Sequence, residues 1–203
     1  MKTILIKKYK NEDEAINRAS TILKKTLKKG DVILTKPRLN NIRLKIRHFP
    51  SFVLSKFSRG FTHSCLYLGE GYVLEIGSRF TDTKIKKFKL ESLLKSKIDF
   101  FKGITVYVVQ PKYYKYKHRN LVFKIAINSF LKKSKDLVFS YWELFKLWLK
   151  LIFNYNKFSK KEKLYFKEGW NCSELVAYTL KKAGVKIGTR KTMFFLPSTF
   201  VFS

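Results

Sequence analysis

The chain has 203 residues and a mass of 24.1 kDa, which is enough for one well-buried domain and too little for two comfortable ones. Its 45% hydrophobic and 16% aromatic content argues against an intrinsically disordered protein. With 44 lysines and arginines against 14 acidic residues, the formal net charge is +30, which indicates anionic partners such as nucleic acid, membrane headgroups or acidic polymers.

The first part of the chain predicts two strands on either side of a helix. Residues 3–6 are apolar and are expected to form a short strand. The acidic segment 11–14 is typical of a helix start, and the apolar residues that follow recur at helical spacing until Gly30. Residues 31–35 predict the second strand. The basic segment 38–60 is irregular and is interpreted as a loop with one short helix.

The clearest β signal is a hairpin within residues 62–76. Two β-rich runs flank the sequence Gly-Glu-Gly at 69–71, and glycines in this position mark a tight turn. A three-residue loop centred on the glutamate places His63 opposite Gly77 and makes Glu75 its diagonal neighbour on the same face. A two-residue loop would instead turn Glu75 to the other face, so the register is a specific prediction.

The second half of the chain predicts two further strands and more helix. The strands are expected at 84–88 and 104–110, with a short helix at 90–95 between them. From 119 to about 158 the pattern is helical, aromatic and lysine-rich, and a final helix covers residues 172–183. Because strands and helices do not alternate regularly, the sequence predicts an α+β fold rather than a doubly wound sheet.

Cys172 is the candidate nucleophile because it opens the last predicted helix. A thiol at a helix N-terminus lies at the positive end of the helix dipole, beside backbone N–H groups that have no helical partner. Both effects favour the thiolate, and the same N–H groups could hold a developing oxyanion. The alternative is a small buried residue at a helix start, so the assignment requires a base nearby.

His63 is the candidate base, and Glu75 is the candidate residue that orients it. His63 lies within a predicted strand, whereas His48 and His118 lie in basic segments and are expected at the surface. A satisfied core histidine is the alternative interpretation of His63. Since a carboxylate in an apolar strand is costly to bury alone, Glu75 is expected to pair with His63. With Cys172, these residues form a Cys-His-Glu arrangement for acyl transfer.

Several segments occur in an order that is typical of one family. They are GDVIL at 30–34, FTHSCLYLG at 61–69, VLE at 73–75 and NCSELV at 171–176, and LPSTF follows at 196–200. Together they resemble the permuted NlpC/P60 cysteine hydrolases, the YiiX-like group of papain-fold proteins. The resemblance covers residues 30–110 and 165–203.

The resemblance implies a circularly permuted papain-like fold, in which an antiparallel sheet or barrel packs against the cysteine-bearing helix. It places His63, Glu75 and Cys172 at the positions of the catalytic residues, and Tyr141 and Ser173 are the candidates for substrate contact. Family members act on amide or ester bonds, so we expect a cysteine hydrolase or acyltransferase. The expected substrate is a peptide, a peptidoglycan fragment or a lipid.

The segment at about 119–167 is longer and more hydrophobic than the family pattern requires. It is interpreted as a helical, aromatic and lysine-rich insertion in a single catalytic domain of residues 1–203. Within it, residues 139–154 have a narrow polar stripe, which fits either a core helix or a helix at an anionic membrane surface. Nucleic acid is less favoured as a partner because no recognised reading helix is present. A non-catalytic basic module that binds membrane or nucleic acid is the alternative function.

Other kinds of site and segment are not expected. No apolar run approaches the ~18 residues that a membrane-spanning helix needs, and residues 1–8 lack the features of a signal peptide. We therefore expect a monomer in the cytoplasm or bound peripherally at the inner face of a membrane. The 2 cysteines and 3 histidines lack zinc-site spacing, so no metal or other cofactor is predicted. An AT-rich coding sequence would also produce this lysine content, so the charge has a compositional alternative.

Overall fold

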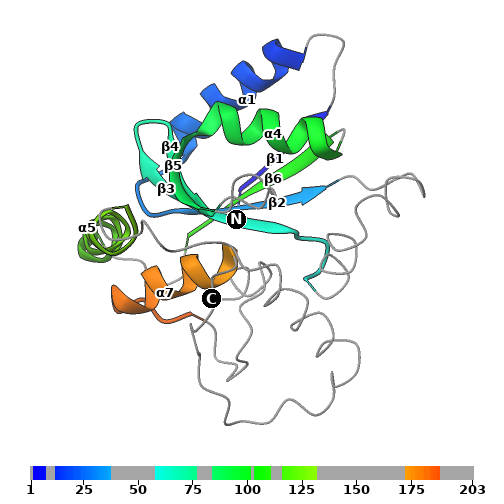
Figure 1. The fold of residues 1–203 in the computed structure, drawn as a ribbon. Helices are drawn as coiled ribbons and strands as arrows, with labels where there is room; N and C mark the ends of the chain where they lie inside the picture. The colour runs from blue at the N-terminus through cyan, green and yellow to red at the C-terminus, as the bar shows by residue number, and fades with distance from the viewer. Residues whose placement is uncertain are drawn as a thin grey trace, which may run out of the picture.

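The described part of the chain forms a sheet with helices on both faces (Figure 1). The computed structural model describes residues 2–7, 12–37, 58–76, 84–101, 103–110, 116–131 and 172–187. The strands are β1 (Lys2–Lys7), β2 (Val32–Pro37), β3 (His63–Gly69), β4 (Tyr72–Ile76), β5 (Ile85–Lys89) and β6 (Gly103–Val109). They form one six-stranded sheet in the order β1-β6-β2-β3-β4-β5, and every neighbouring pair is antiparallel. The α+β class and the antiparallel sheet are therefore confirmed.

The sheet is open, so the expectation that it might close into a barrel is wrong. In the described segments, β1 and β5 form its two edges, with the other strands between them. The β5 edge carries exposed lysines, namely Lys84, Lys86, Lys87 and Lys89. Charged side chains on an edge strand disfavour pairing with a further strand, because each would have to be desolvated. The lysines of β5 therefore disfavour the pairing of another strand at this edge of the sheet.

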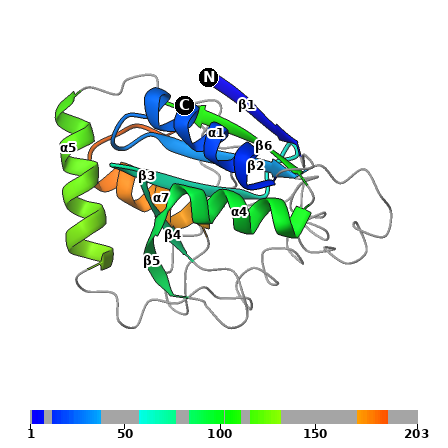
Figure 2. The same ribbon diagram turned by 90° about the horizontal axis from the view of Figure 1, so that it is seen from above.

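The helices lie in two layers, one on each face of the sheet (Figures 1 and 2). They are α1 (Glu12–Thr26), α4 (Leu90–Phe101), α5 (Tyr116–Ile125), a π-helical continuation η1 (Ala126–Leu131) and α7 (Cys172–Lys182). Helices α1 and α4 cover one face, while α5 and α7 cover the other. Within the described residues, none of these helices is both long enough and apolar enough to cross a membrane.

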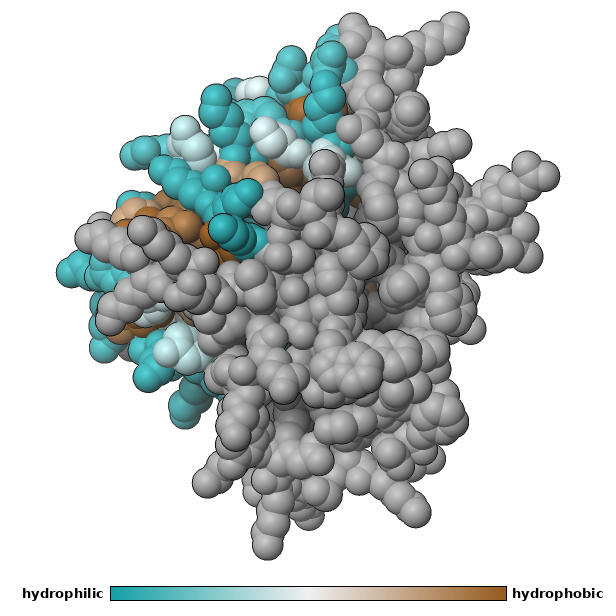
Figure 3. Space-filling view, in the orientation of Figure 1, coloured by the Kyte–Doolittle hydropathy of each residue, from teal (hydrophilic) through white to brown (hydrophobic). Residues whose placement is uncertain are grey.

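Each face of the sheet has its own apolar core, as the alternation of side chains along a strand requires. On β2, Val32 and Leu34 pack in the core with α7, whereas Ile33 packs in the core with α1 and α4. The outer surface over α1 and α4 is hydrophilic and includes exposed lysines (Figure 3). One side of each helix is thus apolar and the other charged, which fixes how it lies on the sheet.

The predicted hairpin is present between β3 and β4. Residues Gly69, Glu70 and Gly71 all have positive φ values, of 96°, 53° and 76°, so the chain reverses through a left-handed turn that favours glycine. Leu66 pairs with Leu74 in the predicted register, and a bulge shifts the pairing nearer the turn. The predicted register and its consequence for the face of β4 are therefore confirmed. The three-residue loop is wrong: β3 extends to Gly69, which pairs with Tyr72, so the loop is Glu70 and Gly71, and the bulge supplies the extra residue that keeps the register.

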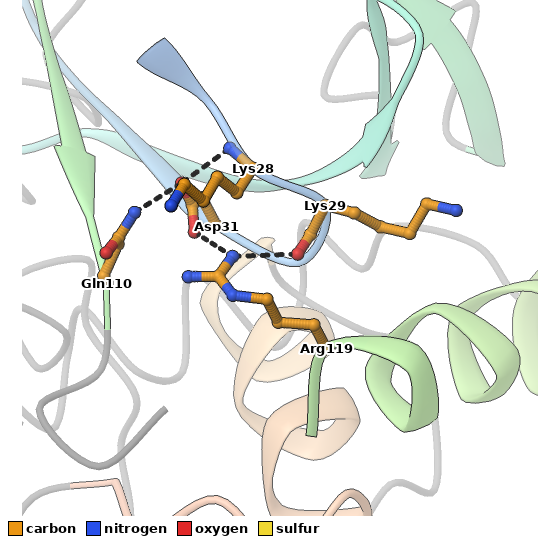
Figure 4. A network of polar contacts seen from close by, with 5 residues as sticks. All are labelled: Lys28, Lys29, Asp31, Gln110 and Arg119. Atoms are coloured by element: carbon orange, nitrogen blue, oxygen red, sulfur yellow. Dashed lines mark hydrogen bonds and ion pairs between the residues drawn. The ribbon is translucent and has the colours of Figure 1, made fainter. Parts of the chain in front are cut away.

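A buried carboxylate ties α5 to the sheet (Figure 4). Asp31 lies at the start of β2 and is fully buried. Its carboxylate accepts hydrogen bonds from the Lys28 backbone N–H at 2.9 Å, Gln110 Nε2 at 3.1 Å and Arg119 Nη1 at 2.6 Å. Arg119 also donates to the Lys29 carbonyl at 3.0 Å. One side chain thus joins the end of β6, the start of β2 and α5.

The predicted helices are found where the structure describes them. The helix expected at 90–95 extends to Phe101, and the helix expected from residue 119 begins at Tyr116. The predicted helix near 52–57, the stretch 139–154 and most of the insertion expected at 119–167 lie outside the described residues.

Candidate active site

His63 and Glu75 meet on the face of the sheet that α4 covers. His63 is the first residue of β3, and Glu75 lies in β4. His63 Nε2 lies 2.9 Å from Glu75 Oε1, and the two side chains are only 6% and 8% exposed. The carboxylate lies off the N–H direction of Nε2, so the contact is an ion pair rather than a linear hydrogen bond. The predicted pairing of these two residues is confirmed.

The strands β3 and β4 part beside this pair. Their pairing ends at Leu66 and Leu74 in the described part of the chain. The Tyr67 N–H donates to the Asp31 carbonyl on the β2 side at 2.9 Å, and N–H groups alternate along a strand, so the Ser64 N–H points to the β4 side. This N–H contributes to lowering the pKa of the Cys172 thiol. Cys172 on α7 therefore acts on His63 at the end of β3 that lies beyond its pairing with β4 in the described segments.

Cys172 is the first residue of α7 and is buried. Burial alone would raise the pKa of its thiol. The positive charge of His63, a hydrogen bond with the His63 ring, the Ser64 N–H and the charge of Lys97 outweigh burial and lower the pKa to about 7. A substantial fraction of this thiol is therefore thiolate near neutral pH.

The groups around His63 also favour an ion pair between the His63 imidazolium and the Cys172 thiolate. Burial and the charge of Lys97 lower the pKa of His63, while the negative charges of Glu75 and Cys172 and a hydrogen bond with Cys172 raise it. The pKa of His63 is raised overall. Because each charge stabilises the other, the site favours a thiolate beside an imidazolium.

Lys97 is a member of the site that our sequence analysis missed. It lies on α4, is buried, and places Nζ 3.3 Å from Glu75 Oε1. In a chain with 44 basic residues, one more lysine carries no signal by its type. Its spacing does carry a signal, because Lys97 continues the apolar face of Leu90, Leu93 and Leu94 at helical spacing.

Glu75 is held in its charged form by two cations. Burial alone would raise the pKa of its carboxyl group. The charges of Lys97 and His63, both in close contact with the carboxylate, reverse this effect and lower the pKa to about 2. Lys97 on α4 and His63 on β3 thus both contact Glu75, and His63 in turn acts on the thiol of Cys172 on α7.

The other candidate residues have different surroundings. Ser173 is buried, with its Oγ 3.2 Å from Ser64 Oγ and 3.9 Å from the Cys172 sulfur, so its contact with substrate remains a prediction. Tyr141 lies outside the described residues. Cys65 is fully buried, and burial followed by the charge of Glu75 raises the pKa of its thiol well above the ordinary value. The two thiols are therefore chemically distinct.

Sequence comparisons identify no relative of this chain. No protein-family model matches the chain, and no curated protein has a similar sequence. Within the described segments, no group of three His, Cys, Asp or Glu side chains is arranged to hold a metal ion.

Proposed function

We propose that this protein is a cysteine hydrolase or acyltransferase that cleaves an amide or ester bond through a thioester on Cys172. The proposal is carried by the His63–Glu75 ion pair in a buried site, next to a Cys172 thiol whose pKa His63 lowers. A thiol of lowered pKa beside an imidazole that a carboxylate holds is the arrangement that activates sulfur nucleophiles for acyl transfer.

In the first half of the reaction, the Cys172 thiolate attacks the carbonyl carbon and forms a C–S bond. The carbonyl π electrons move to oxygen, and the backbone N–H groups at the start of α7 stabilise the resulting oxyanion. The His63 imidazolium donates its proton to the leaving nitrogen or oxygen as that bond to carbon breaks. The products are a neutral thioester, a neutral imidazole and the released amine or alcohol.

In the second half, a water molecule or another acceptor attacks the thioester carbon. His63 takes the proton from the attacking oxygen, and Glu75 holds the ring while it becomes charged. The tetrahedral intermediate then expels the Cys172 thiolate. Release of the acid or ester product restores the thiolate and the imidazolium.

The order of the elements supports a relationship to the permuted NlpC/P60 hydrolases. The helix with Cys172 follows the strands with His63 and Glu75, as the resemblance implies for a circular permutation of the papain fold. The proposed substrates are accordingly peptides, peptidoglycan fragments or lipids. Both cysteines are free, which supports a place in the cytoplasm or at the inner face of a membrane. The net charge of +30 supports peripheral contact with anionic lipid.

The direct test is the capture of an acyl group on Cys172. The protein is incubated with p-nitrophenyl esters of short and long fatty acids and with an amide analogue, and the intact mass is measured after rapid acid quenching. We expect the mass of one acyl group on Cys172 and continued release of p-nitrophenol. Cys172→Ala abolishes both, whereas Cys65→Ala retains them.

Equal release by the native protein and Cys172→Ala, with no adduct, would contradict this function. That result would favour the alternative of a non-catalytic basic module that binds a membrane or nucleic acid. Salt-dependent binding of the native protein to anionic vesicles or to DNA, without any acylation, would identify that alternative.

A further inference from the structure

We propose that Lys97 is a positioning residue that keeps His63 neutral once Cys172 has been acylated, so that the second half of the reaction can proceed. This inference rests on the proposed function and extends it. It assigns a role to a buried lysine that the acyl-transfer mechanism above does not use.

The contact geometry places one carboxylate between two cations. Lys97 Nζ and His63 Nε2 lie 3.3 Å and 2.9 Å from the same oxygen, Oε1, of Glu75. All three side chains are nearly enclosed, with exposures of 11%, 6% and 8% for Lys97, His63 and Glu75. The single negative charge of Glu75 is therefore shared by both cations, and it balances only one of them.

The charges balance differently before and after acylation. In the resting site, Lys97 and His63 carry positive charges while Glu75 and the Cys172 thiolate carry negative ones, so the cluster is neutral. Thioester formation removes the negative charge from sulfur. A protonated His63 would then leave two positive charges against one negative charge in a buried site, which is strongly unfavourable.

The neutral imidazole is the form that the second half requires. His63 has just given its proton to the leaving group, and the charge of Lys97 opposes its reprotonation from solvent. His63 can therefore take the proton from the attacking water. Without Lys97, Glu75 alone would stabilise the imidazolium, and the thioester would persist at neutral pH.

The other groups around His63 do not alter this balance. Glu75 on β4, Lys97 on α4 and Cys172 on α7 are the charged groups that act on the ring among the described residues. Thr35 on β2 lies directly opposite His63, and its hydroxyl group is uncharged. The charge of Lys97 lowers the pKa of His63, whereas Glu75 and Cys172 raise it, which is the sign that the proposal needs.

The first test follows the protonation of His63 without any substrate. In a Cys65→Ala background, the ring is titrated by NMR with Cys172 free and then blocked as its methyl disulfide, which removes the sulfur charge. We expect blocking to lower the His63 pKa by about one unit or more, a tenfold change in proton affinity. In Lys97→Met, the blocked protein should keep a His63 pKa about one unit above that of the blocked parent.

Two further variants separate charge from structure. Lys97→Arg keeps the positive charge and should restore the low His63 pKa of the blocked parent. Lys95→Met, on the same helix, removes an exposed lysine that is 3.1 Å from Asp13 and should leave the His63 pKa unchanged. Identical His63 titrations in the blocked parent and the folded, blocked Lys97→Met variant would overturn the proposal.

The second test uses burst kinetics with a p-nitrophenyl ester. At neutral pH, Lys97→Met should retain the acylation burst and lose about tenfold in steady-state turnover, with recovery at higher pH as His63 deprotonates. Equal slowing of the burst and the steady state would overturn the assignment to the second half. If the native protein cleaves neither the esters nor the amide analogue, the proposed function fails, and the NMR titration still decides whether Lys97 controls His63.

Discussion

The protonation of His63 depends on side chains from three different elements, namely Glu75 on β4, Lys97 on α4 and Cys172 on α7. Burial alone would favour the neutral forms of Glu75, His63 and Cys172, because a charge removed from water costs several kcal/mol. The mutual attraction of these charges, together with Lys97, reverses that preference for Glu75 and Cys172. The site is therefore sensitive to the loss of any one member.

The variant Glu75→Gln tests whether the Glu75 carboxylate is charged, through the pH dependence of the free energy of unfolding. The pKa falls from 4.5 to about 2 in the folded protein, so the charge contributes stability above pH 4.5 that is lost as the pH falls through 2. We expect the difference in unfolding free energy between the native protein and Glu75→Gln to shrink between about pH 5 and about pH 2. Urea denaturation at several pH values measures it.

A matched control is Glu70→Gln, which changes an exposed residue of the hairpin turn. Its effect on the unfolding free energy should be only a few tenths of a kcal/mol at every pH. A difference for Glu75→Gln that stays constant across the acidic range would contradict the charged, paired state of this residue.

At the scale of elements, the hairpin was the most predictable part of the site. Gly69 and Gly71 specify the turn, the turn specifies the register, and the register brings Glu75 to the face of His63. Each step is local in sequence, so sequence reasoning could follow it. The packing of α7 against β3 and β4 joins residues about 100 positions apart in the chain, so it is a long-range property.

Gly69→Ala tests the turn itself. Gly69 has a φ of +96°, and an added Cβ would lie 3.2 Å from the Lys29 side chain. We expect the variant to lose about 1–2 kcal/mol of stability, because an L side chain is strained in this region. Thermal unfolding measures the change. The control Glu70→Gly places a glycine at a residue with positive φ, so it should not lower the stability. Equal stability of Gly69→Ala and the native protein would argue against the left-handed turn.

At the scale of the whole molecule, the site depends on helices from both layers. Lys97 comes from the layer of α1 and α4, and Cys172 from the layer of α5 and α7. The sequence indicated the class of fold and three of the four charged groups. Among so many lysines, residue type could not single out Lys97, and only its place on the apolar face of α4 marked it. The hydrogen bonds of Asp31 with Gln110 and Arg119 could not be predicted, because these partners lie far away in the chain.

Asp31→Ala tests the link between the sheet and the α5 layer. The change removes the acceptor of hydrogen bonds from the Lys28 N–H, Gln110 and Arg119. Since the carboxylate is fully buried, we expect a loss of about 3–5 kcal/mol in unfolding free energy. Chemical denaturation measures this loss. The control Asp13→Ala removes an exposed ion pair with Lys95 and should cost less than about 1 kcal/mol. Similar losses in the two variants would contradict the anchoring role of Asp31.

The expected state of the Cys172 sulfur near neutral pH is a thiolate that His63 stabilises. It is tested by the rate of iodoacetamide alkylation of each cysteine, resolved by peptide mass spectrometry between about pH 5 and pH 10. We expect the Cys172 rate to rise with a midpoint near pH 7, while Cys65 in the folded protein reacts far more slowly. His63→Ala should move the Cys172 midpoint up by at least about one unit. An unchanged midpoint in His63→Ala, or equal slow labelling of both cysteines, would contradict the account.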